Sequence, residues 1–312
     1  MNIKPFKTYN EQIAILKERG IDFSDPNSKR FAKRHLQRIG YYSLINGYSR
    51  PFMLEHNKYK EGTTINDIYY LYNFDKKMRD TFLKYILPVE TNIKSLIAYT
   101  FSEQHSEPNY LVYSNFDIKS KDAHRFITEL LSEIQRQIYS RSSDPCISHY
   151  LKNYGYVPLW VLSNILTFGT MSKFYSLMNQ NERQTIAKIF KVTDSELISM
   201  LNFMSAIRNI CAHGNRLYCF KSKKMLCNTK YHKSMNIPYD DSKGYLYGKY
   251  DLFALMIIFK SLLSRAELNR LIKSVENNLK YVFSGIKTLS NEDILSMLGF
   301  PNNWKELLRQ HS

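Results

Sequence analysis

The sequence has few cysteines, no long apolar run and comparatively few acidic residues, and each shortage excludes a class of protein. Four cysteines in 312 residues are too few for a disulfide scaffold and suit a reducing cytoplasm. The longest uninterrupted apolar run, Leu252 to Phe259, is far shorter than the roughly 20 residues of a membrane span. The opening stretch MNIKPFKTYNEQ has no apolar segment typical of a signal peptide. We therefore expect a cytoplasmic protein without a membrane anchor.

Motifs of the common enzyme classes are also missing. There is no Walker A loop, no G-x-G-x-x-G, no H-E-x-x-H, no G-x-S-x-G and no C-x-x-C, so the chemistries that depend on them are disfavoured. A set of zinc ligands could be assembled from cysteines and histidines. However, the sequence has no closely spaced pair of cysteines and no closely spaced pair of histidines of the kind found in structural zinc sites. The members of the set would be Cys211, His213, Cys219, Cys227 and His232. We predict ordinary buried or free thiols, no metal and no cofactor.

Positive charge exceeds negative charge, and the excess lies in two segments. The chain has 44 Lys and Arg against 28 Asp and Glu, a formal net charge of +16. Residues 1–60 hold 12 basic and 5 acidic side chains, and residues 216–250 hold 8 and 2, while the rest is nearly balanced. Two basic segments beside a neutral core favour a polyanion, most commonly nucleic acid, over a membrane surface, because neither segment is a clean amphipathic helix. A solvated charged face is the alternative for each segment.

Helical patterns dominate the chain, and alternating strand patterns are nearly absent. Capping boxes at Thr8, Thr64 and Thr193 mark three helix starts, and Pro88 is expected to kink or divide the helix that begins after Thr64. Further helices are predicted over residues 26–40, 121–141, 145–153, 159–168, 171–178, 182–190, 195–213, 251–264, 265–283 and 291–298. We predict an all-α protein with a helical body over residues 61–312 and a small basic helical extension over residues 1–60. Residues 217–247 resist a helical interpretation and are predicted to form a hairpin or an irregular basic segment.

One group of residues is a candidate for chemistry: Arg208, Asn209 and His213, at the end of the predicted 195–213 helix. Asn209 and His213 are four residues apart and can share a ligand. Arg208 lies near the edge of an apolar stripe, where an unpaired cation is costly, so it requires a carboxylate or an anion as partner. Similar Arg/His spacing recurs twice, at Arg30 with His35 and at Arg50 with His56, so only the helical context distinguishes this group.

Two interpretations of this helix end are open. In the structural one, His213 caps the last carbonyls of its own helix, beside Arg208 paired with Glu90 or Asp75. In the functional one, the negative end of the helix dipole favours protonated His213, which suits a general acid or base. The same dipole repels phosphate, so Arg208, Asn209 and Arg216 would be needed to hold a phosphate there.

Other residues are candidates for binding RNA. Basic side chains recur along one predicted helix and again just after the helix end, in both cases with a solvated face as the alternative. They are Arg30, Lys33, Arg34 and Arg38 in the first segment and Arg216, Lys221, Lys223 and Lys224 in the second. For the aromatic block Tyr41, Tyr42, Tyr48 and Phe52, core packing is favoured over base stacking.

The string from Arg208 to Leu217, RNICAHGNRL, resembles the RNxxxH motif of HEPN-superfamily ribonucleases, as found in the AbiD/AbiF abortive-infection family. Further similar blocks occur in order along nearly the whole chain: Gly40 to Phe52, Tyr72 to Arg79, Glu90, Pro158 to Trp160, Thr167 to Gly169, and Gly299 to Trp304. Two features depart from the pattern. Tyr218 stands where a Trp is expected, and Pro88 interrupts the helix that carries Glu90.

The resemblance implies an HEPN-type helical bundle and a metal-independent endoribonuclease that acts as a toxin in phage defence. It assigns Arg208, Asn209 and His213 to catalysis. Such sites usually join two Arg/His motifs across a two-fold axis, and this chain has one, so the resemblance also implies a homodimer. The apolar outer face of the 195–213 helix, with Ile198, Phe203 and Ile210, would suit such a contact. A small structured noncoding RNA is expected to bind and restrain the toxin. A non-catalytic RNA-binding protein that acts by sequestration is the alternative.

Overall fold

The computed structural model describes residues 5–105, 108–119 and 121–309, and it confirms the predicted all-α fold. Strands within these ranges form two short antiparallel hairpins. The N-terminal elements are α1 (Tyr9–Glu18), α2 (Ser28–Ile39), a π-helical turn (Tyr42–Asn46), a 3-10 turn (Arg50–Phe52), β1 (Met53–Glu55) and β2 (Lys58–Tyr59). The central elements are α3 (Ile65–Gln104), a 3-10 turn (Tyr113–Asn115), α4 (Ala123–Ser140), α5 (Pro145–Tyr154), α6 (Leu159–Ile165), α7 (Phe168–Leu177), α8 (Gln180–Ile189) and α9 (Asp194–Ala212). The last elements are α10 (Lys230–Ser234), β3 (Tyr239–Asp240), β4 (Gly244–Tyr245), α11 (Leu252–Leu262), α12 (Arg265–Gly285), α13 (Asn291–Leu298) and α14 (Trp304–Arg309).

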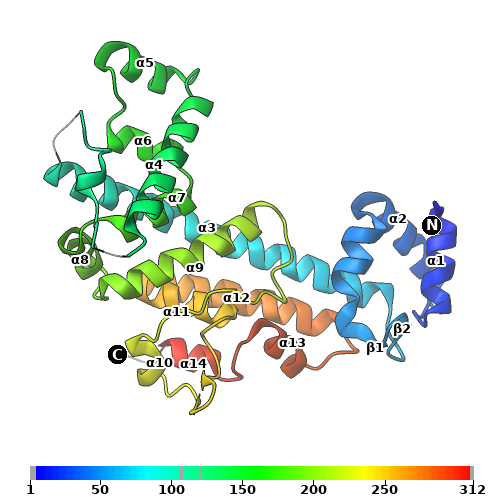
Figure 1. Cartoon of the computed structure of the whole chain (residues 1–312). Coiled ribbons are helices and arrows are strands. Elements are labelled where there is room, and N and C mark those ends of the chain that lie inside the picture. The colour runs from blue at the N-terminus through cyan, green and yellow to red at the C-terminus, as the bar shows by residue number, and fades with distance from the viewer. Residues whose placement is uncertain (1–4, 106–107, 120, 310–312) are drawn as a thin grey trace.

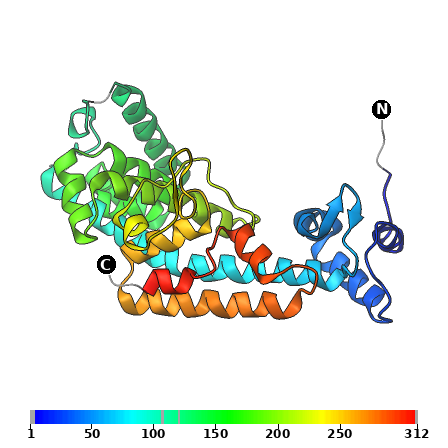
Figure 2. The same ribbon diagram turned by 90° about the horizontal axis from the view of Figure 1, so that it is seen from below.

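The long helix α3 organises the molecule. The elements α1, α2 and the β1–β2 hairpin lie at its N-terminal end, and helices α4 to α8 gather at its other end (Figure 1). Helices α9 and α12 pack along α3, and α12 runs beside it for much of its length (Figure 2). Side-chain hydrogen bonds join α12 to α3, with Asn278 donating to Thr81 at 2.9 Å and Asn73 donating to Tyr281 at 3.2 Å. The candidate helix α9 is therefore held against the central element of the fold.

Pro88 does not divide α3, although division was one of the two outcomes expected from the sequence. The helix continues for 40 residues from Ile65 to Gln104. Pro88 and Lys84, whose carbonyl loses its usual hydrogen bond, are both exposed, while the neighbouring Val89 and Glu90 are buried. Water can satisfy the free carbonyl on the exposed side, and packing of the opposite side keeps the helix continuous.

Aromatic packing attaches the N-terminal elements to the start of α3. The imidazole of His35 lies 4.0 Å from the ring of Tyr69 and 4.2 Å from that of Phe31, measured between ring centroids. His35 is 6% exposed, and burial lowers its pKa. The Arg30/His35 match in the sequence therefore belongs to a core histidine rather than to a second Arg/His site. Whether residues 1–60 form a separate unit stays a prediction.

Residues 217–247 contain one short helix, α10, and one hairpin, β3–β4, between irregular stretches. The segment is anchored by buried Leu217, Leu226 and Ile237. Its His232 is fully buried, lies 3.0 Å from the hydroxyl of Thr229 and contacts the carbonyl of Gly248 at 2.9 Å. The irregular segment is thus packed into the body of the protein, while its lysines at 221, 223 and 224 remain exposed.

Gly299 gives a test of the packing between α13 and α11. It ends α13 with a φ of +74°, and a methyl group on it would overlap the side chain of Asp251, the N-cap of α11. We expect Gly299→Ala to lower the free energy of unfolding by about 1–3 kcal/mol, from overpacking and backbone strain together. Gly155→Ala is the matched control, because Gly155 ends α5 with a φ of +77° but has open space around it. Equal urea midpoints for the two variants would contradict the proposed overlap.

Candidate functional site

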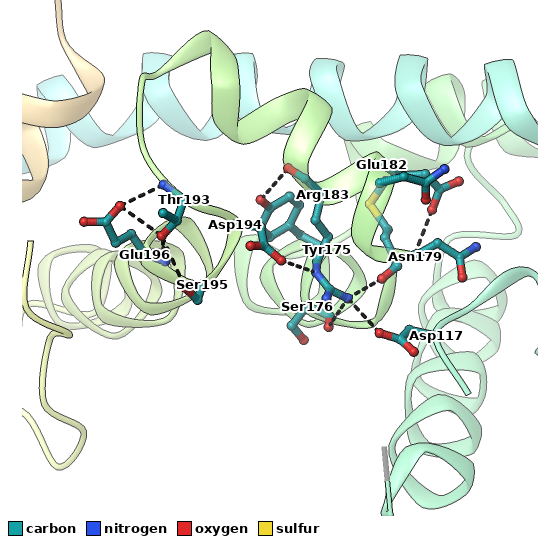
Figure 3. Close-up of polar contacts among 12 residues, drawn as sticks. Asp117, Tyr175, Ser176, Asn179, Glu182, Arg183, Thr193, Asp194, Ser195 and Glu196 are labelled. Atoms are coloured by element: carbon teal, nitrogen blue, oxygen red, sulfur yellow. Dashed lines mark hydrogen bonds and ion pairs between the residues drawn. The ribbon is translucent and has the colours of Figure 1, made fainter. Parts of the chain in front are cut away.

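The N-terminal end of α9 is fixed by its own cap and by one arginine. The predicted capping box is present, with Thr193 and Glu196 bonded to each other's backbone amides. Arg183 of α8 extends between Asp194 and Asp117, donating to their carboxylates at 3.2 and 3.3 Å (Figure 3). Arg183 also donates to the carbonyl of Met178. These bonds join α8, the loop before α4 and the start of α9, so the position of α9 is well determined.

At its other end, α9 stops in a glycine-containing turn that leaves the imidazole of His213 available. Gly214 has a φ of +68°, and the backbone amide of Asn215 donates to the carbonyl of Ile210 at 3.0 Å. The amide of Gly214 donates to the carbonyl of Cys211, and the amide of His213 donates to that of Asn209. Backbone groups therefore satisfy these carbonyls at the helix end. His213 is exposed, and within the described residues its side chain makes no hydrogen bond or ion pair. The side chain of His213 therefore does not cap the helix.

Arg208 pairs with Glu90, one of the two carboxylates anticipated from the sequence. Its Nε lies 3.2 Å from the Glu90 carboxylate, which also pairs with Lys94 at 2.9 Å. Glu90 is buried, whereas 31% of the Arg208 side chain is exposed. Lys94 already compensates the charge of Glu90, and the two Nη groups of Arg208 make no further bond within the described residues. Arg208 is thus oriented through Nε while keeping the paired donors that suit a phosphate.

The exposed surface of α9 is a polar strip rather than the apolar face considered from the sequence. Asn202, Asn209 and His213 are exposed, while Phe203 is only 3% exposed and packs edge-on against Phe220 of the following segment. Ile198 and Ile210 are half-buried. The apolar face is therefore largely covered by the same chain and gives little support to a dimer, so any contact with a second copy through α9 would use the polar strip.

A buried carboxylate, Asp75 of α3, ties the segment after α9 to the N-terminal elements. Asp75 accepts hydrogen bonds from the amides of Leu217 and Tyr218, at 3.1 and 2.6 Å, and from the hydroxyl of Tyr48 at 2.7 Å. It also forms a buried ion pair with Arg79. Burial raises the pKa of Asp75, while the cationic Arg79 and the hydrogen bonds act in the opposite direction. This network fixes the chain immediately after His213.

A groove of about 620 Å³ opens where these parts meet, and we call it the α9-end groove. Its basic side chains come from three elements, α2, α3 and the segment after α9: Arg38, Lys76, Arg79 and Arg216. Asp80 is the one acidic residue in its lining. Burial raises the pKa of the lining Cys211 thiol to about 12, so this cysteine stays protonated and is a poor nucleophile. The residues on both sides of His213 in the chain line the groove, although His213 itself is not part of the lining.

The RNA-binding candidates are all exposed, but the structure does not bring them to one place. Arg38 and Arg216 line the α9-end groove, and Arg216 also donates to the carbonyl of Gly47 at 3.3 Å. Arg30 and Lys33 line a separate groove of about 500 Å³ between α1 and α2. Arg34 and the lysines at 221, 223 and 224 are exposed outside both grooves.

Two features of this groove were not predicted from the sequence. Lys76 and Arg79 lie in the Tyr72–Arg79 block that resembles the known family, but neither was assigned a role. In the aromatic block Tyr48 and Phe52 are buried, as favoured, whereas Tyr42 is 79% exposed. No pattern of local sequence separates Tyr42 from its buried neighbours, because its exposure depends on the π-helical turn in which it sits.

Two general features of the described residues bear on the nature of the site. No three His, Cys, Asp or Glu side chains in residues 5–105, 108–119 and 121–309 are grouped so that they could hold a metal ion. Within the same ranges, none of the helices combines the length and hydrophobicity needed to cross a lipid bilayer.

The fold and this helix end define a helical protein in which an exposed histidine follows a partly exposed, carboxylate-bound arginine by five residues, with a basic groove at the end of the same helix. The chain matches the family of Abi-like proteins over residues 34–219, more than half of its length, and it belongs to that family. The match runs from α2 to the segment after α9 and includes Asp75, Glu90 and the Arg208–His213 motif. Membership supports a role in abortive infection, a form of phage defence. No match was found among curated proteins or among solved structures.

Proposed function

We propose that this protein is a metal-independent endoribonuclease of the HEPN type, related to AbiD/AbiF proteins, that acts as a toxin in phage defence and is restrained by a small noncoding RNA. The observation that carries the proposal is the state of the motif residues. Arg208 is oriented by Glu90 but keeps both Nη groups free of other bonds in the described residues, and His213 is exposed with its imidazole unused. The groups that the motif needs for chemistry are therefore not occupied by contacts within the fold.

The proposed reaction is attack by a ribose 2′-oxygen on the adjacent phosphorus. His213 removes the 2′-hydroxyl proton, the bond from phosphorus to the 5′-oxygen breaks, and a second proton donor protonates the leaving 5′-oxygen. The products are a 2′,3′-cyclic phosphate and a 5′-hydroxyl. Arg208 and Asn209 stabilise the charge on the pentacoordinate phosphate through hydrogen bonds.

The second proton donor is the reason to propose a homodimer. Helical geometry separates Arg208 and His213 by about 140° around the axis and roughly 7.5 Å along it, so one copy presents them on different sides of α9. A second copy related by a two-fold axis would supply the same motif from the opposite direction. The exposed Asn202, Asn209 and His213 would lie closest to that axis.

The function is tested by comparing the wild-type protein with Arg208→Ala in cells and in vitro. We expect the wild type to stop growth and to cleave RNA in the presence of EDTA, leaving 2′,3′-cyclic phosphate ends. Arg208→Ala should reduce cleavage about 10²–10³-fold, as loss of a group that stabilises a developing anion usually does. Arg141→Ala is the matched control, because Arg141 is exposed at the end of α4.

The same experiment separates the nuclease from a protein that acts by binding RNA alone. If the wild type leaves RNA intact and Arg208→Ala remains as toxic as the control, the nuclease proposal fails. The restraining RNA is tested by the 260/280 nm absorbance ratio of the purified wild type at moderate salt. A ratio typical of pure protein would contradict that part of the proposal.

A further inference from the structure

Two grooves meet at one exposed tyrosine in the N-terminal elements. The α9-end groove continues, across Tyr42 and Asn46, into a second groove of about 1090 Å³, which we call the extension groove. Tyr42 and Asn46 line both grooves and are both exposed. They belong to the π-helical turn Tyr42–Asn46, which follows Gly40, a residue with a φ of +88°. The turn therefore lies at the junction of the two grooves.

Positive charge is found on both sides of this turn. In the α9-end groove, buried Asp75 neutralises Arg79, so Arg38, Lys76 and Arg216 face a single acidic residue, Asp80. Arg38 and Lys76 make no ion pair in the part of the chain that the structure describes. In the extension groove, Lys7 pairs with Glu11 and Glu55 pairs with Lys58, which leaves Arg19 and Arg50 as charges without an ion pair in the described residues. Each groove thus carries a net charge of +2 with histidine neutral.

The ring of Tyr42 is exposed and does not pack against the rest of the protein. Its side chain is 79% exposed, whereas Tyr48 in the same block is 3% exposed and lies in the core. The side chain of Tyr42 makes no ring contact and no hydrogen bond within the described residues. An aromatic ring that stands free between two cationic grooves is suited to stack on a nucleobase while phosphates occupy the charges on either side.

We propose that single-stranded RNA runs from the α9-end groove over Tyr42 into the extension groove, with one base stacked on Tyr42 and phosphates bound by Lys76, Arg38 and Arg216. A single strand is required because the bases of a duplex are already stacked on one another and are not free to contact a ring. The path begins beside the turn that holds His213, so it leads one end of the strand to the proposed cleavage site. The inference rests on the proposed function only for the role of this RNA as substrate.

Binding is measured by fluorescence anisotropy with a labelled RNA of about 12 nucleotides, within the site sizes usual for single-strand binders. Every protein carries Arg208→Ala, so that the proposed cleavage does not consume the probe. We expect Tyr42→Ala to weaken binding about 5- to 150-fold, the range found for loss of one stacked base, and Tyr42→Phe to keep most of the affinity. Lys76→Ala should lower the slope of log K against log salt by about 0.7, the value for one phosphate contact on a single strand.

The controls are an exposed tyrosine and an exposed lysine in the α4–α8 region. Tyr139→Ala on α4, where Tyr139 is 82% exposed, and Lys188→Ala on α8 should both bind like the parent. The same RNA annealed to its complement should bind equally well with and without Tyr42→Ala. The inference is overturned if Tyr42→Ala binds the single strand as tightly as Tyr139→Ala, if the duplex loses as much affinity as the single strand, or if the parent binds no RNA.

The two proposals fail in different ways. If the proposed RNA path is wrong, Tyr42→Ala binds RNA with unchanged affinity, whether or not the wild type cleaves RNA. If the proposed nuclease function is wrong, the wild type leaves RNA intact, whether or not Tyr42 contributes to binding. Because Tyr42 is exposed and unpacked, thermal unfolding of Tyr42→Ala should match that of the parent, and this measurement excludes misfolding as the cause of weaker binding.

Discussion

Replacement of His213 by alanine is expected to lower the rate of RNA cleavage about 10²–10⁴-fold, the usual contribution of a general acid or base. The fold should not change, because the imidazole is exposed and backbone amides satisfy the end of α9. Cleavage of a labelled single-stranded RNA under single-turnover conditions, with EDTA present, measures the effect. This separation of activity from stability is the strongest test of the motif, since a structural histidine would affect both.

His149→Ala is the matched control for His213→Ala, because His149 is exposed on α5 in another part of the molecule. It should cleave RNA at the wild-type rate. Added imidazole should restore part of the activity of His213→Ala, since a small base can occupy the space that the side chain leaves. Wild-type cleavage by His213→Ala would show that this residue does not transfer the proton, even if Arg208→Ala is inactive.

Replacement of Asp75 by alanine is expected to lower the free energy of unfolding by about 3–5 kcal/mol, the cost of breaking a buried ion pair from one side. Arg79 would remain as an uncompensated cation of which the side chain is only 8% exposed. The amides of Leu217 and Tyr218 and the hydroxyl of Tyr48 would each lose an acceptor in the interior. Urea unfolding at neutral pH measures the loss.

Asp80→Ala is the control for Asp75→Ala, because Asp80 lies on the same helix but is exposed and makes no ion pair in the described residues. Its effect should stay within about 0.5 kcal/mol, as for most surface substitutions. Asp75→Asn keeps the size of the side chain and removes its charge, so it isolates the ion pair with Arg79 from the packing. If Asp75→Ala and Asp80→Ala unfold at the same urea concentration, the network around Asp75 does not hold the α9-end groove together.

Local features of the fold could be predicted because they depend on neighbours in the sequence. The capping boxes at Thr8, Thr64 and Thr193 are present as predicted, since a cap needs only residues three positions apart. Most helix bounds lie within a few residues of their prediction. The possibility that Pro88 divides α3 was not realised, because the effect of a proline depends on which side of the helix faces water.

The candidate site was predicted only in part, for a related reason. Arg208 and its partner Glu90 were anticipated, because a cation at the edge of an apolar stripe requires a carboxylate. Asp75 was considered as a partner of Arg208, but it pairs with Arg79 and accepts amides that follow it by more than 140 residues. Contacts over such separations depend on how the helices pack, which periodicity does not specify.

The sequence by itself determined the helical class, the caps, the excess of basic charge and the Arg208–His213 motif. Each of these follows from composition or from spacing within one or two helical turns. The tertiary structure alone decided that Arg208 keeps its Nη groups available, that Phe220 covers the apolar face of α9 at Phe203, and that Tyr42 stands between two basic grooves. These features depend on which surfaces meet when α3, α9 and the N-terminal elements pack. Burial of apolar surface and close packing over the whole chain determine which surfaces meet.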